Sequence, residues 1–148
     1  MNMISPPLIL YRISHFFHKN RMGFISKIIS WLNRFLFAVW IPGSAKIGKN
    51  TILGYWGLGV VIHSRAIVGN NCVISQNVTI GRNLKDKDVT KIGDNVYIGP
   101  GTVIFGEIII GNNVIIGANS VVNKSFPDNV VIAGCPARII KINDIKQI

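Results

Sequence analysis

A repeat of six residues constrains the fold of this 148-residue chain more than any other feature. A large apolar residue, most often followed by glycine, recurs at steps of six, and a smaller residue stands two positions before most of them. Because residues two apart in a strand point to the same side, each hexad supplies one large and one small inward side chain. The large positions are Ile47, Leu53, Ile62, Val68, Ile74, Ile80, Ile92, Ile98, Phe105, Ile110, Ile116 and Val122, and the small ones are Thr51, Val60, Ala66, Cys72, Val78, Thr90, Val96 and Val114.

Asparagine marks the corners between hexads, because it tolerates positive φ and bonds its own backbone. Asn50, Asn71, Asn77, Asn95 and Asn113 hold the same place in their hexads. The last three recur at intervals of three hexads, so three hexads make one coil of a triangular prism. An ordinary β-sandwich would instead place turn signals about every 8–12 residues. The sequence therefore predicts a mainly β fold, a left-handed parallel β-helix.

The repeat divides the chain into a helical cap at residues 1–41, a β-helix at residues 42–136 and a tail at residues 137–148. Residues 82–91 lack the apolar pattern, which predicts a loop extruded from the β-helix. Solenoids bury the apolar side of a terminal cap, which is the arrangement expected here. Alternatively, the basic helices lie on an anionic membrane. The cap's apolar stripe, at helical spacing, is Ile25, Ile28, Ile29, Leu32, Phe35, Leu36 and Val39.

Charge is distributed unevenly, since the 16 Lys and Arg outnumber the 6 Asp and Glu and no acid precedes Asp86. This asymmetry predicts an acidic partner, such as a phosphate-bearing ligand or a membrane surface. Nucleic acid is the weakest choice, because no nucleic-acid-binding module is recognisable. The two cysteines form no disulfide pattern or zinc cluster, so a cytoplasmic location is expected. The longest apolar run is too short to span a bilayer, which leaves peripheral contact with the inner face as the membrane alternative.

Four segments outside the bare repeat resemble the serine acetyltransferase-like branch of the hexapeptide-repeat acyltransferases. They are Tyr11–His15, Ser44–Gly48, Gln76–Gly81 and the Ala-Gly-Cys-Pro-Ala-Arg run at residues 133–138. The resemblance implies an enzyme that takes acetyl from acetyl-CoA without a metal. It also implies a homotrimer with active sites in the clefts between neighbouring β-helices.

This sequence departs from the serine acetyltransferases where they carry key polar residues. Trp40 stands in place of an Asp before the first coil, Trp56 or Tyr55 in place of the catalytic His, and Val89 in place of a loop His. The run Gly57–His63 resembles short acetyltransferases of capsule and O-antigen gene clusters instead. The resemblance therefore implies a sugar hydroxyl as the acceptor, on a saccharide or a nucleotide- or lipid-linked precursor of cell-surface polysaccharide.

His63 is the predicted general base, because an imidazole accepts a proton near neutral pH and His63 takes a corner position that glycine holds in most hexads. Asp86 and Asp88 are the candidates for orienting it. The predicted acceptor-site residues are Tyr55, Trp56, His15, Asn83 and Lys85. By resemblance, pantetheine lies along Gly99, Gly101, Ala118 and Asn119, and the phosphates of coenzyme A meet Lys124, Arg138 and Lys141.

Three other functions remain open at this point. A serine acetyltransferase with relocated catalytic residues would use the same coenzyme. An amino-sugar N-acetyltransferase would need only the same base and donor. A non-catalytic β-helix scaffold would bind no acetyl-CoA.

Overall fold

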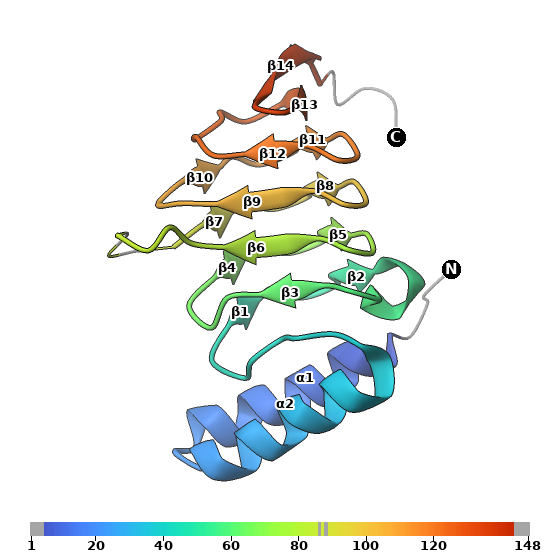
Figure 1. Ribbon diagram of the computed structural model, residues 1–148, viewed down its shortest axis with the longest axis vertical. Helices are drawn as coiled ribbons and strands as arrows, with labels where there is room; N and C mark the ends of the chain where they lie inside the picture. The colour runs from blue at the N-terminus through green and yellow to red at the C-terminus, as the bar shows by residue number, and fades with distance from the viewer. Residues whose placement is uncertain (1–4, 86, 88, 144–148) are drawn as a thin grey trace.

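The computed structural model describes residues 5–85, 87 and 89–143. Within these residues, two helices lie at one end of a column of short strands (Figure 1). The helices are α1 (Pro6–Lys19) and α2 (Gly23–Phe37), and a short 3-10 helix, η1, spans Gly54–Gly57. The strands are β1 (Lys46–Ile47), β2 (Ile52–Leu53), β3 (Val61–Ile62), β4 (Ile67–Val68), β5 (Val73–Ile74), β6 (Thr79–Gly81), β7 (Lys91–Ile92), β8 (Tyr97–Ile98), β9 (Val103–Phe105), β10 (Ile109–Ile110), β11 (Ile115–Ile116), β12 (Val121–Val122), β13 (Val130–Gly134) and β14 (Ala137–Ile142).

In the described part of the chain, the strands form three sheets that make the faces of a prism. Their orders are β1-β4-β7-β10, β3-β6-β9-β12 and β2-β5-β8-β11-β13-β14. All neighbours are parallel except β13 and β14. Tyr97 pairs with Ile115, which follows it after one uninterrupted coil of three hexads. The predicted parallel β-helix is confirmed, and its coil length of three hexads with it.

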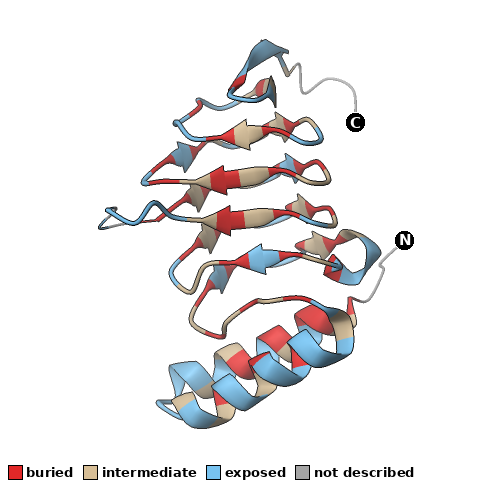
Figure 2. Ribbon diagram, in the orientation of Figure 1, coloured by how far each residue is buried: buried red, intermediate tan, exposed pale blue. Residues whose placement is uncertain are grey.

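The interior of the prism holds the large and small side chains that the hexads predict, with one exception. The prediction that Phe105 points inward is wrong, because Ile104 is the fully buried residue of β9 and Phe105 is half-buried. Large residues such as Ile62, Ile80 and Ile98 have no exposed surface, and the small ones beside them are also buried (Figure 2). Thr90 and Thr102 are buried as well, and each hydroxyl donates to a glycine carbonyl, of Gly106 and Gly117 respectively, at 3.1 Å. Burial of these stacked apolar rows is the main term that stabilises the β-helix.

A ladder of asparagines runs along one corner of the prism. Each side-chain amide donates to the next asparagine, from Asn50 through Asn71, Asn95 and Asn113 to Asn129, at 2.9–3.2 Å. All five have φ between 55° and 59°, the left-handed region that asparagine tolerates better than most residues.

The prediction that Asn77 shares this corner is wrong. Asn77 pairs through its backbone amide with Leu58 and lies at the corner that Gly101 and Asn119 occupy in later coils. The coil from Val73 to Tyr97 is longer than three hexads because it includes the extruded loop. The spacing of three hexads from Asn77 to Asn95 therefore joins two different corners.

The two helices form an antiparallel hairpin that is bound to the first coil by polar contacts. The Tyr11 hydroxyl donates to the Ala45 carbonyl at 2.7 Å and accepts from the Ile47 amide at 3.1 Å. The Arg12 guanidinium donates to carbonyls of Ile47 and Gly48. These bonds hold the hairpin across the open end of the β-helix.

Most of the apolar stripe of α2 is exposed, which corrects the prediction that the cap buries it on the β-helix. Ile28, Leu32, Phe35 and Leu36 are exposed, whereas Ser26, Ser30 and Asn33 are buried against α1. Of the predicted stripe, Val39 alone is fully buried, and Ile25 and Ile29 are half-buried. The hairpin therefore has a polar interior and an apolar outer side.

The last described strand, β14, lies within the predicted C-terminal tail. It folds back antiparallel on β13 and covers the far end of the six-stranded sheet. None of the described helices has both the length and the apolar character that crossing a membrane requires.

Candidate active site

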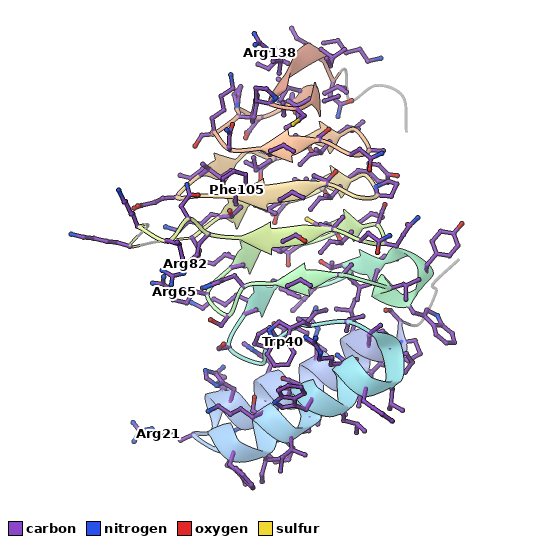
Figure 3. The ribbon with its side chains drawn as sticks, viewed as in Figure 1. Arg21, Trp40, Arg65, Arg82, Phe105 and Arg138 are labelled. Carbon is purple, nitrogen blue, oxygen red and sulfur yellow. The ribbon has the colours of Figure 1, made fainter. Side chains whose placement is uncertain are left out.

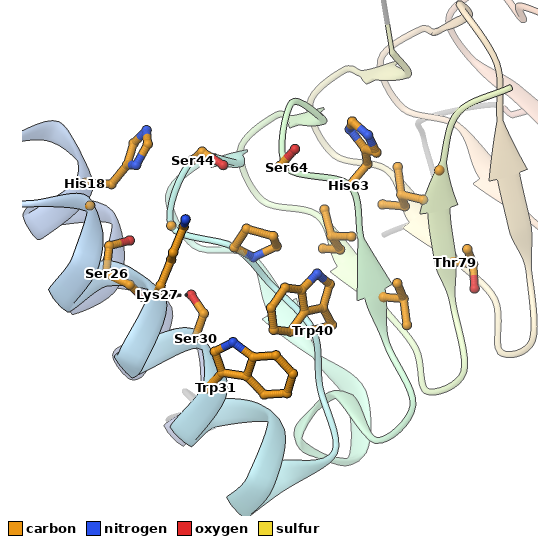
Figure 4. Close-up of a pocket in the computed structure, with 17 residues that line it drawn as sticks. His18, Ser26, Lys27, Ser30, Trp31, Trp40, Ser44, His63, Ser64 and Thr79 are labelled. Carbon is orange, nitrogen blue, oxygen red and sulfur yellow. Dashed lines mark hydrogen bonds between the residues drawn. The ribbon is translucent and has the colours of Figure 1, made fainter. Parts of the chain in front are cut away.

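A cavity of about 750 Å³ lies where the hairpin meets the first coils of the β-helix (Figure 4). Its walls come from the two helices, from Trp40 and the residues 42–44, from β3 with the two residues that follow it, and from β6. Ligand-binding cavities of about 300–1,000 Å³ are typical for small molecules. This cavity contains His63, the predicted base.

His63 is held at a corner by the backbone of two successive coils. Its amide donates to the Ile80 carbonyl at 2.8 Å, and its own carbonyl accepts from the Ala66 amide at 3.0 Å. The residue after Ile80 is Gly81, so no side chain from that coil covers the imidazole at this position. The hexad thus fixes the backbone of His63 and leaves its side chain half-buried at the edge of the cavity.

The surroundings of His63 favour its neutral form. Partial burial, and then the positive charges of Arg65 and Arg82, lower the pKa of His63 below its ordinary value of 6.5. Both arginines lie at the same edge of the β-helix (Figure 3). A neutral imidazole at pH 7 has the lone pair that a general base needs.

Hydrogen bonding decides where that lone pair lies. The backbone amide of Arg65 donates to Nδ1 of His63 at 3.2 Å. In the neutral imidazole the proton is then on Nε2, and Nδ1 is the basic nitrogen.

The extruded loop begins at the same edge as His63. The Arg65 guanidinium donates to the Lys87 carbonyl at 2.7 Å, which links the two segments. Asn83 and Lys85 are exposed on this loop, and neither lines the cavity. The predicted orienting carboxylates, Asp86 and Asp88, lie outside the described residues.

Tyr55 and Trp56 lie at a different corner from His63, on the opposite end of strand β3. They line a second cavity of about 680 Å³ together with the end of α2. Trp56 packs edge-on against Phe37, with ring centroids 6.0 Å apart. Both residues have positive φ, near 50°, which is uncommon for bulky side chains and marks this turn as constrained by its surroundings. The structure therefore does not bring these two aromatic residues to His63 within one chain.

The residues predicted to bind pantetheine gather at the corner of Tyr55 and Trp56. The Asn119 amide donates to the Pro100 carbonyl at 2.8 Å, so residues 99–101 and 118–119 lie in adjacent coils of one corner. Gly101 and Asn119 both have positive φ. Ala118 and Asn119 are exposed, and Gly99 is buried.

The three predicted phosphate-binding residues are exposed near the C-terminal end. Arg138 and Lys141 lie on β14, and Arg138 stands at the far end of the prism (Figure 3). Lys124 follows β12, at the corner of the extruded loop, with its ammonium 5.5 Å from the centroid of the Phe126 ring. The three side chains therefore belong to two separate places on the surface.

His15 bonds the hairpin to the β-helix. Its Nδ1 lies 2.7 Å from the Gly43 carbonyl oxygen, and its ring packs near Tyr11 at 5.7 Å between centroids. Gly43 has no side chain to separate it from Ser14 and Ser26, which permits this close approach. His15 lines neither of the two cavities, whereas His18 lines the first one.

Sequence reasoning missed the aromatic wall of the His63 cavity. Trp31 from α2 and Trp40 lie with ring centroids 5.4 Å apart, and the Arg34 guanidinium is 5.8 Å from each ring centroid. Trp40 pairs with Val61 below β3, as an extra strand would. A repeat of period six gives no signal for residues that precede its first hexad, so only the folded chain brings the two tryptophans together.

Comparisons with known proteins agree with this architecture. A family profile described as "Bacterial transferase hexapeptide (six repeats)" matches residues 90–124. A protein named serine acetyltransferase from Staphylococcus epidermidis is 43% identical over 131 residues, which are 87% of this chain and 61% of that protein. The chain thus spans about three-fifths of the length of this relative.

Solved structures of serine acetyltransferases are similar to this chain over most of its length. A serine acetyltransferase from Brucella abortus in complex with coenzyme A superposes with a TM-score of 0.89 at 32% identity, over 93% of this chain and 55% of that one. A serine acetyltransferase from Neisseria gonorrhoeae in complex with serine gives 0.86 at 30% identity, over 91% and 55%. The repeats, the fold and these relatives show a hexapeptide-repeat β-helix that is similar to the serine acetyltransferases over the part that they share.

Proposed function

We propose that this chain forms an acetyl-CoA-dependent O-acetyltransferase whose acceptor hydroxyl binds beside His63. The observation that carries the proposal is a half-buried His63, with its pKa lowered, at the edge of a cavity large enough for a small molecule. The relatives are acetyltransferases by name, and one of the similar structures contains coenzyme A. These comparisons support acetyl-CoA as the donor.

The reaction needs one base and no covalent intermediate. Nδ1 of His63 takes the hydroxyl proton as the oxygen attacks the thioester carbonyl of acetyl-CoA. The tetrahedral intermediate then collapses, the bond from carbon to sulfur breaks, and the thiolate takes the proton from the imidazolium. For this step the acceptor hydroxyl has to displace the Arg65 amide, whose bond of 3.2 Å to Nδ1 is long.

Serine is the acceptor that the comparisons favour. The matched relatives carry the name serine acetyltransferase, and none of those described here supports the polysaccharide acceptor that was the main prediction from the sequence. A saccharide is a second candidate, because a cavity of about 750 Å³ with two tryptophans in its wall exceeds what an amino acid fills. Aromatic faces are suited to packing against the apolar faces of sugar rings.

A homotrimer would complete the site. Within one chain, β3 separates His63 from the corner that holds Gly101, Ala118 and Asn119. If pantetheine lies at that corner, its thioester reaches the His63 of a neighbouring copy rather than of its own chain. The proposal therefore places each active site between two copies.

The test measures coenzyme A release from acetyl-CoA with L-serine, a panel of saccharides and a panel of amino sugars in parallel. His63→Ala should lower turnover by about 10²–10⁴-fold with the preferred acceptor. His18→Ala is the matched control, because His18 lines the same cavity from the hairpin and is assigned no part in the reaction. Near-normal turnover of His63→Ala would remove His63 from the mechanism. Absence of acetyl-CoA binding by calorimetry would favour the scaffold.

A further inference from the structure

The helical hairpin has an apolar outer side that the fold leaves uncovered. The outer face is defined here as the exposed large apolar side chains of α1 and α2. Leaving out Trp31, which lines the His63 cavity, they are Ile9, Ile13, Phe16, Phe24, Ile28, Leu32, Phe35 and Leu36, and the last two border the second cavity. Phe24 and Phe35 are 77% and 87% exposed. Exposed large apolar side chains in this number on two neighbouring helices indicate a site of interaction.

The interior of the hairpin has the opposite character. The Ser14 hydroxyl lies 3.0 Å from the Ser26 hydroxyl and 3.1 Å from that of Ser30, and it donates to the Ser26 carbonyl at 2.9 Å. The Asn33 amide donates to the Pro7 carbonyl at 3.0 Å. Small hydrogen-bonded residues between helices, with large apolar residues outside, are the arrangement that helices adopt where their surroundings are apolar.

Positive charge accompanies this apolar face. Lys19 and Arg21 are exposed at the turn between the helices, with Arg21 pointing away from the molecule (Figure 3). No acidic residue precedes Asp86, so neither helix carries a negative charge that would offset these two. Amphipathic helices with aromatic residues on one side and Lys and Arg beside them bind anionic lipid surfaces.

We propose that the outer face of the hairpin docks on an anionic lipid membrane, with the helices lying in the plane of the interface. The helices have 14 and 15 residues, and about 20 are needed to span a bilayer, so the hairpin lies on the membrane and does not cross it. The β-helix then projects away from the lipid, because it stands on the other side of the hairpin (Figure 1). This inference does not depend on the proposed acetyl transfer.

The test is flotation of the full chain with vesicles of phosphatidylcholine, alone or with about 30% phosphatidylglycerol. The wild-type chain should float with the anionic vesicles. Phe24→Ser with Ile28→Ser should weaken this binding by about tenfold or more, because it removes two apolar anchors that line neither cavity. Ile109→Ser with Ile140→Ser is the matched control on exposed sites of the β-helix and should float like wild type.

Charge is tested separately. Lys19→Glu with Arg21→Glu should reduce flotation, whereas Lys124→Glu with Arg138→Glu makes the same change of charge at a distance from the hairpin and should not. Failure of the wild-type chain to float, or equal flotation of the Phe24 and Ile28 double variant, would overturn the proposal. A lower mass of that double variant in lipid-free solution would also overturn it, because the outer face would then be a contact between copies.

Discussion

The β-helix and the hairpin bury opposite kinds of residue. In the β-helix, the apolar member of each hexad points inward and the corners are polar. In the hairpin, serine and asparagine point inward and phenylalanine, isoleucine and leucine are exposed. An apolar stripe therefore indicates that a helix packs against an apolar surface, and that surface does not always belong to the same chain.

The largest expected effect is on stability, when one apolar residue is truncated in each region and the two losses are compared. Ile98→Ala removes a fully buried side chain and should lower the free energy of unfolding by about 2–5 kcal/mol. Phe35→Ala removes an exposed one and should change it by less than about 0.5 kcal/mol. Urea unfolding followed by circular dichroism measures both. Similar losses from the two variants would show that the outer face is packed in solution and would break the comparison.

A second prediction concerns the polar interior of the hairpin. Ser30→Leu makes α2 more apolar, yet it should lower the free energy of unfolding by about 1–3 kcal/mol because leucine overfills the contact with Ser14 and Ser26. Leu32→Ser, on the exposed side, should leave stability within about 0.5 kcal/mol. Thermal unfolding, followed by circular dichroism at the helical band, gives the midpoint temperatures that separate the two variants. Stabilisation by Ser30→Leu would mean that the hairpin interior tolerates ordinary apolar packing.

The smallest expected effect concerns the cavity between the two regions. Arg65→Gln removes a positive charge that lowers the pKa of His63, so this pKa should rise toward its ordinary value. The neutral imidazole is the active base, so the acidic limb of kcat/KM against pH should move to higher pH. Lys27→Gln is the control from the hairpin side of the cavity, and it should leave the limb in place.

A nuclear magnetic resonance titration of the His63 ring measures the same shift without any substrate. A titration unchanged by Arg65→Gln would show that the guanidinium does not act on the imidazole in solution.

Much of the β-helix was predictable because its period carries three-dimensional information. A hexad fixes which residue points inward, and three hexads return the chain to the same face, so Ile62 and Ile80 were correctly expected in neighbouring core positions. The shared corner of Asn50, Asn71, Asn95 and Asn113 was predicted correctly, whereas Asn77 was assigned to it wrongly and Asn129 was not named. Counting hexads fails across an extruded loop, because the loop adds residues without adding a corner.

The candidate site was predicted less completely. His63 was found because it replaces glycine in a regular pattern, and its role remains a prediction. Tyr55 and Trp56 lie close to it in sequence but at another corner, because a strand of the β-helix carries the chain across one whole face of the prism. Trp31 belongs to a helix far from His63 in the sequence, yet it lines the same cavity.

The sequence by itself determined the β-helix, most of its inward residues and the existence of an amphipathic helical pair. These follow from periodicity, since the backbone geometry of strands and helices converts spacing directly into direction. The tertiary structure decided which side of the hairpin faces the β-helix and where His63 stands relative to Trp40. Each of these depends on contacts between residues far apart in the chain, such as the bonds of Tyr11 to Ala45 and of Ser14 to Ser26, and no local pattern encodes them.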